Sequence, residues 1–464
     1  MSILIFGIVL MTALWVSCDK KETIVAEFGP HTITLSEFRL AYLQLLKQPD
    51  VFDSPSLREH YLDELIDRRL TAAWSDVHEP VDEKVLLRIN AYHDKCLRDA
   101  HYKSVIAPQV TVDSQLVKKV YAFTTQRRKL KHLFAENNEQ AERLYQRLQN
   151  GEDWDKLAEE VYTDDIMKNN SGELGWVHWD QLEFDMAMAA FTQPHKTFTK
   201  PVKSSYGWHI LYIDNYEINP LLSEDDFNLH QNDIRLLVTQ RLGDRIASDY
   251  INKMMTGIDI KVRPDIMKKV GQHLEQTLTR KPNVFDKMEN FQLTEQEQRK
   301  IEGDLWQYRN EAIVIIGDNE MTVSWLMGSL AYIPYEALYK SFKTTLDFAI
   351  RDFVITKEAR QMQLDGKFSE VNERTGIFAE YSKQIMVRRK LVKNTRLSDD
   401  EIYNYYEANR DELFKSVSFE ETKEQIKQIL LAKKQRENVS KFIQNLRQQN
   451  PIKKNIQSIH DYYN

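Results

Sequence analysis

The apolar positions of the chain fall mostly at helical spacing, with a few short stretches that read as strands. Long amphipathic patterns run from Leu57 to Trp74, from 223 to 255, from Phe342 to Arg360 and from 419 to 448. Because apolar residues three and four apart line one side of a helix, each segment predicts a helix with a buried face. The pattern therefore indicates a mainly α-helical protein.

One strand-and-helix pattern occurs twice. The first copy covers Ile24–Gly29 and Thr34–Phe38, and the second covers Ala312–Gly317 and Thr322–Leu326. Glycine, threonine and serine recur at one offset of 288 residues, in the pairs Gly29 with Gly317, Thr34 with Thr322 and Ser36 with Ser324. Each copy predicts a short strand, a glycine turn, a second strand and a helix capped by threonine or serine.

Two further pairings extend the repeat. Val112–Leu116 is similar to Ser398–Ile402, where the second copy has a capping-box pattern that opens a helix. At an offset of 192 residues, Phe227 pairs with Phe419, Ile234 with Ile426, Tyr250 with Phe442 and Ile260 with Ile452. Between these two pairings the first copy is about 94 residues longer, which is enough for one small inserted domain near 127–217.

The N-terminus predicts an export signal rather than a folded element. Residues 1–17 contain no charged side chain, and Ile3–Val16 is a continuous apolar run that is short for a bilayer span. The run ends at Leu14-Trp15-Val16-Ser17-Cys18, which resembles the lipobox of bacterial lipoproteins. We therefore expect a signal peptide over 1–17 and lipidation of Cys18, with acyl chains anchoring the protein to a membrane. An ordinary cleaved signal with an incidental cysteine is the alternative.

Composition narrows the class of protein. With 42% hydrophobic and 29% charged residues, the 464-residue chain is expected to form globular cores. A net charge of −7 without a basic stripe argues against a nucleic-acid partner. Two cysteines in the whole chain exclude a disulfide scaffold. No segment after the N-terminal run reaches the ~18 apolar residues of a transmembrane helix.

The predicted insertion has a recognisable order of elements. Lys129–Phe134 alternates as a strand, Asn138–Asn150 and Trp154–Tyr162 predict helices, and a further strand follows Gly207. The remaining markers, in order, are Gly151-Glu152-Asp153-Trp154, Tyr162-Thr163-Asp164-Asp165, Gly172-Glu173-Leu174-Gly175-Trp176, Ala189-Ala190-Phe191, Pro201-Val202 and Tyr206-Gly207-Trp208-His209-Ile210. In order and spacing, the segment resembles a parvulin-type peptidyl-prolyl isomerase domain. The flanking segments resemble the helical chaperone portions of the SurA and PrsA family.

The resemblance implies a specific set of site residues. It places a catalytic pair at His132 and His209, which hydrogen-bond each other on neighbouring strands, and a third catalytic position at Asp165. The implied substrate-binding residues are Leu174, Leu182, Met186 and Phe191 on the apolar wall of a proline pocket, and Tyr206 at its rim. Met186 stands where the family commonly has phenylalanine, Leu182 where it has methionine, and Glu183 where it often has glutamine. No cofactor and no metal ion are implied.

Each of these positions also has a purely structural interpretation. The histidines are equally consistent with satisfied core residues, the apolar residues with ordinary packing, and Asp165 with a helix-terminal acid. Prolyl isomerisation breaks no bond, because its barrier is rotation about a C–N bond of partial double-bond character. A catalyst therefore needs an apolar slot and polar groups that stabilise the twisted amide, and no general base.

The predicted fold is mainly α with an inserted α+β parvulin domain, whose small antiparallel sheet is flanked by helices, and with a duplicated helical chaperone-like module. We expect a signal peptide at 1–17, an N-terminal strand–helix module at 18–126, the parvulin domain at 127–217, a C-terminal helix completing the first module at 218–265, a helical connector at 266–310, and a second module without an insertion at 311–464.

The resemblance implies an exported folding factor that is lipid-anchored in the cell envelope and faces the periplasm, with inner and outer membrane both open. Its partners would be unfolded or partly folded exported proteins with Xaa-Pro bonds, and the membrane through the N-terminal lipid. One alternative is a non-catalytic periplasmic chaperone whose degenerate parvulin domain only binds peptides. Another is a structural partner in an envelope complex, with the duplicated module mediating assembly.

Overall fold

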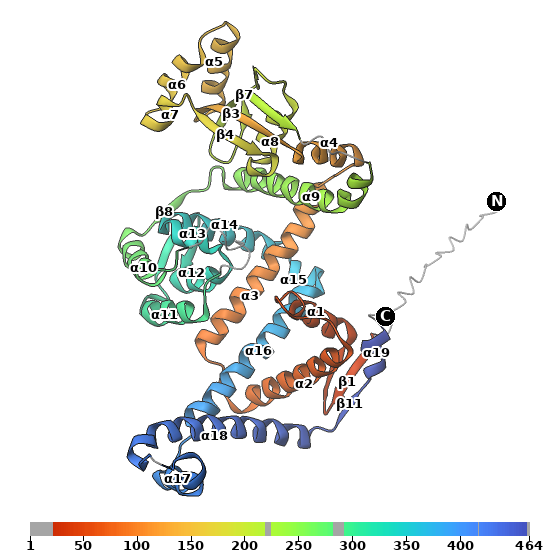
Figure 1. Cartoon of the computed structure of the whole chain (residues 1–464), viewed down its shortest axis with the longest axis vertical. Helices are drawn as coiled ribbons and strands as arrows, with labels where there is room; N and C mark the ends of the chain where they lie inside the picture. Colours follow the sequence, from red (N-terminus) through yellow and green to blue (C-terminus); the bar gives the residue numbers. More distant parts are fainter. Residues whose placement is uncertain (1–21, 219–223, 282–291, 416, 462–464) are drawn as a thin grey trace, which may run out of the picture. The chain divides into compact units, whose positions relative to one another are not determined.

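The computed structural model describes residues 22–218, 224–281, 292–415 and 417–461 (Figure 1). These residues form two compact units: a terminal unit, which joins the chain up to Cys96 with the chain from Asp365 onward, and a central unit, Leu97–Leu364. The predicted signal peptide and Cys18 lie outside the described residues. Within the described ranges, no helix combines the length and the apolar character needed to cross a membrane.

The terminal unit contains a three-stranded sheet and long helices. In chain order its elements are β1 (Ile24–Phe28), β2 (His31–Thr34), α1 (Leu35–Leu45), α2 (Pro55–His78), most of α3 (Glu83–His101), α15 (Leu364–Lys367), α16 (Ser369–Asn394), α17 (Asp399–Leu413), α18 (Phe419–Gln449), β11 (Ile452–Lys454) and α19 (Ile456–Asp461). The sheet has the order β11-β1-β2, and all its strand pairs are antiparallel.

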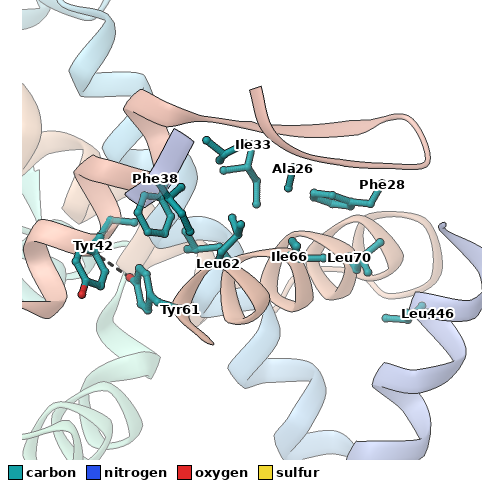
Figure 2. Close-up of a cluster of buried hydrophobic side chains, with 14 residues drawn as sticks. Ala26, Phe28, Ile33, Phe38, Tyr42, Tyr61, Leu62, Ile66, Leu70 and Leu446 are labelled. Carbon is teal, nitrogen blue, oxygen red and sulfur yellow. Dashed lines mark hydrogen bonds between the residues drawn. The ribbon is translucent and has the colours of Figure 1, made fainter. Parts of the chain in front are cut away.

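The hairpin and its first helix form where the sequence predicts them. Gly29 takes a left-handed backbone with φ +58° at the turn, and Thr34 caps α1 in a capping box with Glu37. Beneath the hairpin, apolar side chains of α1 and α2 form a buried core that Leu446 of α18 also joins (Figure 2). The Tyr61 hydroxyl donates a hydrogen bond to the Ala41 carbonyl inside this core.

The central unit contains a second three-stranded sheet outside the inserted domain. Outside the inserted domain, the elements of this unit are the π-helical turn η1 (Tyr102–Ile106), η2 (Ala107–Gln109), α4 (Ser114–Thr124), α9 (Glu224–Met255), β8 (Ile260–Val262), α10 (Pro264–Thr277), α11 (Glu295–Leu305), η5 (Trp306–Tyr308), β9 (Ala312–Ile316), β10 (Asn319–Thr322), α12 (Val323–Ser329), η6 (Leu330–Tyr332), α13 (Tyr335–Lys340) and α14 (Phe342–Gln361). This sheet has the order β10-β9-β8.

The two small sheets share one register and exchange one strand. In the terminal unit, Phe28 of β1 lies opposite Ile452 of β11. In the central unit, the equivalent residue Ile316 of β9 lies opposite Ile260 of β8. The hairpin of the first copy therefore pairs with the strand that ends the second copy, and the hairpin of the second copy pairs with the strand that ends the first.

This exchange corrects the predicted modules. The strands and helices of the repeat form as expected, but residues 18–126 with 218–265 are not one compact unit, and neither are residues 311–464. The two repeated hairpins present equivalent strand edges for pairing. The repeat pattern alone therefore does not decide which copy supplies the third strand.

The second pairing of the repeat is also shifted by one residue from the sequence alignment. The N-caps are Asp113 for α4 and Ser398 for α17, so these two residues correspond. With that shift, Tyr121 corresponds to Tyr406, and each tyrosine meets the first aromatic residue of the next long helix edge-on. The ring centroids are 5.2 Å apart for Tyr121 with Phe227 and 5.5 Å apart for Tyr406 with Phe419.

The segment expected to be a helical connector is packed into the central unit. Its helices α10 and α11 bury apolar side chains almost completely. These buried residues are Ile266, Val270, Leu274, Ile301 and Leu305. Residues 282–291 between the two helices lie outside the described part of the chain. The described part of 266–310 is thus helical, as expected, and it packs as a structural component of the central unit.

The inserted domain is an antiparallel sheet with helices, which confirms the predicted fold class. Its elements are β3 (Gln126–Ala135), α5 (Asn138–Gln149), α6 (Trp154–Val161), α7 (Asp165–Asn169), β4 (Glu173–His178), η3 (Trp179–Gln181), α8 (Phe184–Thr192), β5 (Thr197–Phe198), β6 (Val202–Lys203) and β7 (Trp208–Ile218). The strand order is β4-β3-β7-β5, and β6 also pairs with β7. The long β3–β7 pair forms the centre of this sheet (Figure 1).

The two equivalent turn glycines provide a matched stability test. Both have a left-handed backbone, with φ +58° at Gly29 and +56° at Gly317, where a side chain costs about 1 kcal/mol. A Cβ at Gly29 would also lie 2.4 Å from Asn450 Oδ1, whereas a Cβ at Gly317 meets nothing within 4 Å. Moving Asn450 disturbs the hydrogen bond that its Nδ2 donates to the Leu446 carbonyl.

We therefore expect Gly29→Ala to destabilise its hairpin by roughly 2 kcal/mol and Gly317→Ala to destabilise its hairpin by about 1 kcal/mol. Native-state hydrogen exchange of the β1 and β9 amides measures both values in the full chain. Equal losses in the two variants would contradict the contact with Asn450.

Candidate active site

Two buried histidines meet on the central strand pair of the inserted domain. His132 of β3 lies opposite Leu211 of β7, and His209 lies opposite Phe134, so the histidines are diagonal neighbours. Their Nδ1 atoms are 3.1 Å apart, and the rings stack with centroids 5.4 Å apart. The structure thus brings together the two histidines that the sequence resemblance pairs.

Burial keeps both histidines neutral. The side chains are less than one-tenth exposed, and desolvation, followed by the nearby His209, lowers the pKa of His132 to about 4. Desolvation also lowers the pKa of His209, although Glu183 acts in the opposite direction. At neutral pH the pair carries no charge and offers ring edges for hydrogen bonding.

The backbone of His132 is fixed from the other side of the site. The Tyr162 hydroxyl donates to the His132 carbonyl at 2.8 Å, and the His132 amide donates to the Gly172 carbonyl, also at 2.8 Å. Gly172 has φ +72°, and a Cβ there would lie 2.1 Å from the His132 carbonyl oxygen. The motif Gly172–Trp176 therefore has a physical role, because only glycine permits this close approach.

A serine loop supports His209. Ser204 Oγ lies 2.8 Å from His209 Nε2 and accepts a hydrogen bond from the Tyr206 amide at 3.0 Å. Glu183 accepts hydrogen bonds from both the amide and the hydroxyl of Ser205. The loop between β6 and β7 is thereby tied to the start of α8. Sequence reasoning did not identify Ser204, whose position five residues before His209 was the available signal.

The expected pocket residues lie in one apolar cluster. Met186 and Phe191 of α8 are 7% and 2% exposed, and Leu174 and Leu182 pack against the same cluster. The cluster also contains Val238 of α9, which lies outside the inserted domain. The four predicted wall residues are therefore close together, and the two on α8 are largely covered.

Asp165 and Tyr206 are less closely tied to the histidines. Asp165 is an exposed first-turn residue of α7, and no hydrogen bond or ion pair among the described residues joins it to either histidine. Tyr206 is 78% exposed on the loop before β7. The roles assigned to these two residues stay predictions.

Two arginines that sequence reasoning missed, the buried Arg128 and the partly buried Arg241, hold the walls of the site. Arg128 of β3 caps the C-terminal end of α8, where it donates to the carbonyls of Ala190, Phe191 and Gln193. Arg241 of α9 donates to the Trp179 and Leu182 carbonyls. Arg128 lies on the same face of β3 as the buried Leu130, and Arg241 lies on the same face of α9 as the buried Val238. A charge within such an apolar stripe was the available signal.

Residues 22–218, 224–281, 292–415 and 417–461 present no cluster of three or more His, Cys, Asp or Glu side chains suited to a metal ion. The arrangement offers instead a neutral hydrogen-bonding pair beside an apolar wall. Such a site can position a peptide and exclude water from it.

The segment that contains these residues matches a known domain family. Residues 123–215 match the family described as rotamase, the PPIC-type PPIase domain. The predicted domain boundaries, 127–217, lie within a few residues of this match.

Curated relatives match over different lengths. The chain is similar to the foldase protein PrsA of Geobacillus kaustophilus, with 23% identity over 236 residues, which is 48% of this chain and 80% of that protein. It is also similar to the chaperone SurA of Pseudomonas putida, with 44% identity over 75 residues, which is 16% of this chain and 17% of that protein. Among solved structures, PrsA from Bacillus cereus has 18% identity, with 48% of this chain and 86% of that chain covered and a TM-score of 0.23.

The neutral histidine pair predicts a specific pH dependence of stability. Because the pKa of His132 is lowered from 6.5 to about 4, the unfolded chain binds a proton in this range that the folded chain does not. The stability that His132 contributes is complete above about pH 6.5 and is lost as the pH falls toward 4, by at most about 3 kcal/mol. Native-state hydrogen exchange of the β3 and β7 amides, corrected for intrinsic rates, measures this loss.

The matched variants are His132→Gln and His195→Gln. His195 is an exposed histidine of the same domain, so its replacement should leave the pH dependence unchanged. His132→Gln should make the curve flatter between pH 6.5 and 4. A parental pH dependence in His132→Gln would show that the buried pair is not its source.

Proposed function

We propose that this chain is a peptidyl-prolyl cis–trans isomerase that also acts as a chaperone for exported proteins. The support is that residues 123–215 match the PPIC-type PPIase domain and that the chain has relatives named as foldase and chaperone. The observation that carries the proposal is the neutral His132–His209 pair beside the apolar cluster of Met186 and Phe191. The clients would be unfolded or partly folded chains with Xaa-Pro bonds.

The chemistry requires no proton transfer. A planar prolyl amide is stabilised by resonance, and that stabilisation is lost in the twisted transition state. Loss of resonance also reduces the charge separation in the amide, so a site with little water favours the twisted form over the planar one. Leu182, Met186 and Phe191 supply the apolar surface for the pyrrolidine ring in this mechanism.

The histidines act by fixing the shape of the site. His132 and His209 are neutral, they bind each other through Nδ1, and their neighbours Tyr162 and Ser204 hold them in place. Charging either ring would bring an unpaired cation into a desolvated site, and this would disrupt the pair. The proposed role is therefore positioning, and a general base is not part of it.

The helical units supply the proposed holding function. In the terminal unit, a cavity of about 230 Å³ is lined by four aromatic side chains. These are Tyr61, Tyr92, Phe378 and Tyr381. Aromatic surfaces of this kind bind apolar segments with large contact area, and slow-folding chains expose such segments. We propose that unfolded clients contact this surface while their prolyl bonds isomerise.

One observation favours a second candidate function, a non-catalytic chaperone whose parvulin domain only binds peptides. Met186 and Phe191 are almost fully covered, so little of the proposed proline wall is exposed. Met186 is also more flexible than the phenylalanine common in the family. Under this alternative the domain binds clients without accelerating isomerisation.

We further propose an envelope location with a lipid anchor at Cys18. The support is the apolar run Ile3–Val16 followed by Ser17-Cys18, together with relatives whose names are foldase and chaperone. Two or three acyl chains on one residue add enough buried methylene groups for stable membrane association. The protein would then work on clients that emerge near a membrane.

A pair of methionines on α8 tests the proposed pocket. Met186→Ala should lower kcat/KM for prolyl peptides at least about tenfold, or about 1.4 kcal/mol, because it removes a side chain from the pocket wall. Met188→Ala is the matched control on the same helix. Its side chain packs against the same cluster but is not one of the residues that the resemblance assigns to the pocket, so its loss should change kcat/KM little. A protease-coupled isomerisation assay on the full chain measures both. Equal effects of the two variants would refute the assigned pocket.

The double variant His132→Ala/His209→Ala separates catalysis from holding. We expect the variant to lose isomerase activity but still to suppress the aggregation of an unfolded outer-membrane protein. Light scattering of the diluted client measures the second property. If the double variant retains full isomerase activity, the positioning role of the histidines is wrong.

Lipidation of Cys18 has its own test. The parent protein should partition into the detergent phase of a cell-envelope extract, and Cys18→Ala should move to the aqueous phase because it has no thiol to lipidate. Cys96→Ala is the control for loss of the other cysteine and should partition like the parent. Detergent partitioning of Cys18→Ala like the parent would refute the anchor.

A further inference from the structure

A cavity of about 460 Å³ lies between the inserted domain and helix α9. Leu182, Glu183 and Ser204 line it from the domain, and Asp244 and Ser248 line it from α9. Its volume falls within the roughly 300–1,000 Å³ of typical ligand sites. Because α9 follows the matched residues 123–215, the isolated domain would lack one wall of this cavity.

Arg241 joins the two walls. Its guanidinium donates to the Trp179 carbonyl at 3.0 Å and to the Leu182 carbonyl, and it lies 4.2 Å from the centroid of the Trp179 ring. The contact uses several donors of the planar guanidinium at once, so it fixes both position and orientation. Arg245 adds an ion pair with Asp185 at 3.0 Å. Helix α9 thus holds the loop before α8 from outside the domain.

The cavity shares Leu182 with the apolar wall of the proposed prolyl site and Ser204 with the surroundings of His209. Leu182 belongs to the apolar cluster of the proline wall and also lines the cavity. Ser204 lines the cavity and lies 2.8 Å from His209 Nε2. A client bound with its proline beside Met186 would therefore extend its neighbouring residues toward α9.

The charges of the cavity favour a basic side chain. Its cations are already engaged: Arg241 with two carbonyls, Arg245 with Asp185, and Lys203 with Asp249 at 3.8 Å. Asp244 forms no ion pair within 4 Å among the described residues. Partial desolvation raises the pKa of Asp244 against the opposing effect of Arg241, so its charged form would gain from an incoming cation.

We propose that this cavity, here named the α9 groove, binds the client residues that flank the prolyl bond and prefers a basic side chain there. The proposal rests on the proposed function, because it places the proline in the parvulin site. It makes α9 a specificity element of the isomerase and Asp244 the residue that selects for charge.

Fluorescence anisotropy with the full chain tests the groove. The probes are a tetrapeptide, Ala-Ala-Pro-Phe, and two nonapeptides with a central Ala-Pro that is flanked by lysine or by glutamate. We expect the lysine nonapeptide to bind several-fold more tightly than the glutamate one at low salt. Asp244→Asn should remove this preference. Equal binding of both nonapeptides to the parent would overturn the assigned charge preference.

A variant that fills the groove provides a second test. Ser248→Phe places a bulky ring in the cavity and should weaken the lysine nonapeptide about tenfold, with a smaller effect on the tetrapeptide. Gln240→Phe is the matched control, since Gln240 is exposed on the same helix and does not line the cavity. Unchanged nonapeptide affinity in Ser248→Phe would overturn the groove. Absence of isomerisation by the parent would instead refute the proposed function, while the anisotropy still decides the groove.

Discussion

The pairing of β3 with β7 is the constraint on which the central part of the molecule depends. It runs from Gln126 opposite Ile218 to Ala135 opposite Trp208, with one register shift between Lys129 and Leu130. At one end it brings the entry and exit of the inserted domain together, so that α4 and α9 pack as their counterparts α17 and α18 do in the copy without an insertion. Toward the other end it places His132 and His209 side by side in a desolvated environment. A single ladder thus accommodates the insertion and assembles the histidine pair.

The exchange of β8 and β11 has a comparable effect on the repeats. Each three-residue strand completes the sheet of the other copy, in the same register, so neither copy forms its sheet from its own residues alone. The chain is therefore tied across both copies by backbone hydrogen bonds at residues far apart in sequence. A duplicated segment of this kind forms two dependent halves, although its sequence reads as two independent modules. Helix α9 belongs to the first copy and also contacts the inserted domain, through Arg241.

Periodicity and capping residues were sufficient to predict the strands of the repeat and four of the long helices, and motif order was sufficient to predict the domain; the long helix α16 was not among the predicted helices. The helices α2, α9, α14 and α18 follow their apolar stripes, and Thr34 and Ser398 cap helices as their positions indicate. The strand exchange was beyond prediction, because both copies present equivalent apolar residues to the third strand. Arg128 and Arg241 were missed because their carbonyl partners come from α8 and the loop before it, and only the folded chain brings these groups together. The motif identified His132 and His209, which the structure brings together. It also identified Asp165, but it did not indicate that Asp165 is exposed in the folded chain.

The most direct test of the account is two-dimensional exchange NMR of an Ala-Pro peptide mixed with a small amount of the full chain. Uncatalysed interconversion takes tens to hundreds of seconds, so the peptide alone gives no exchange between its cis and trans signals on the mixing time of the experiment. If the protein is an isomerase, exchange cross-peaks between the two proline forms will be seen when it is present. Broadening of the peptide signals without cross-peaks would show binding without isomerisation and would contradict the proposed enzyme.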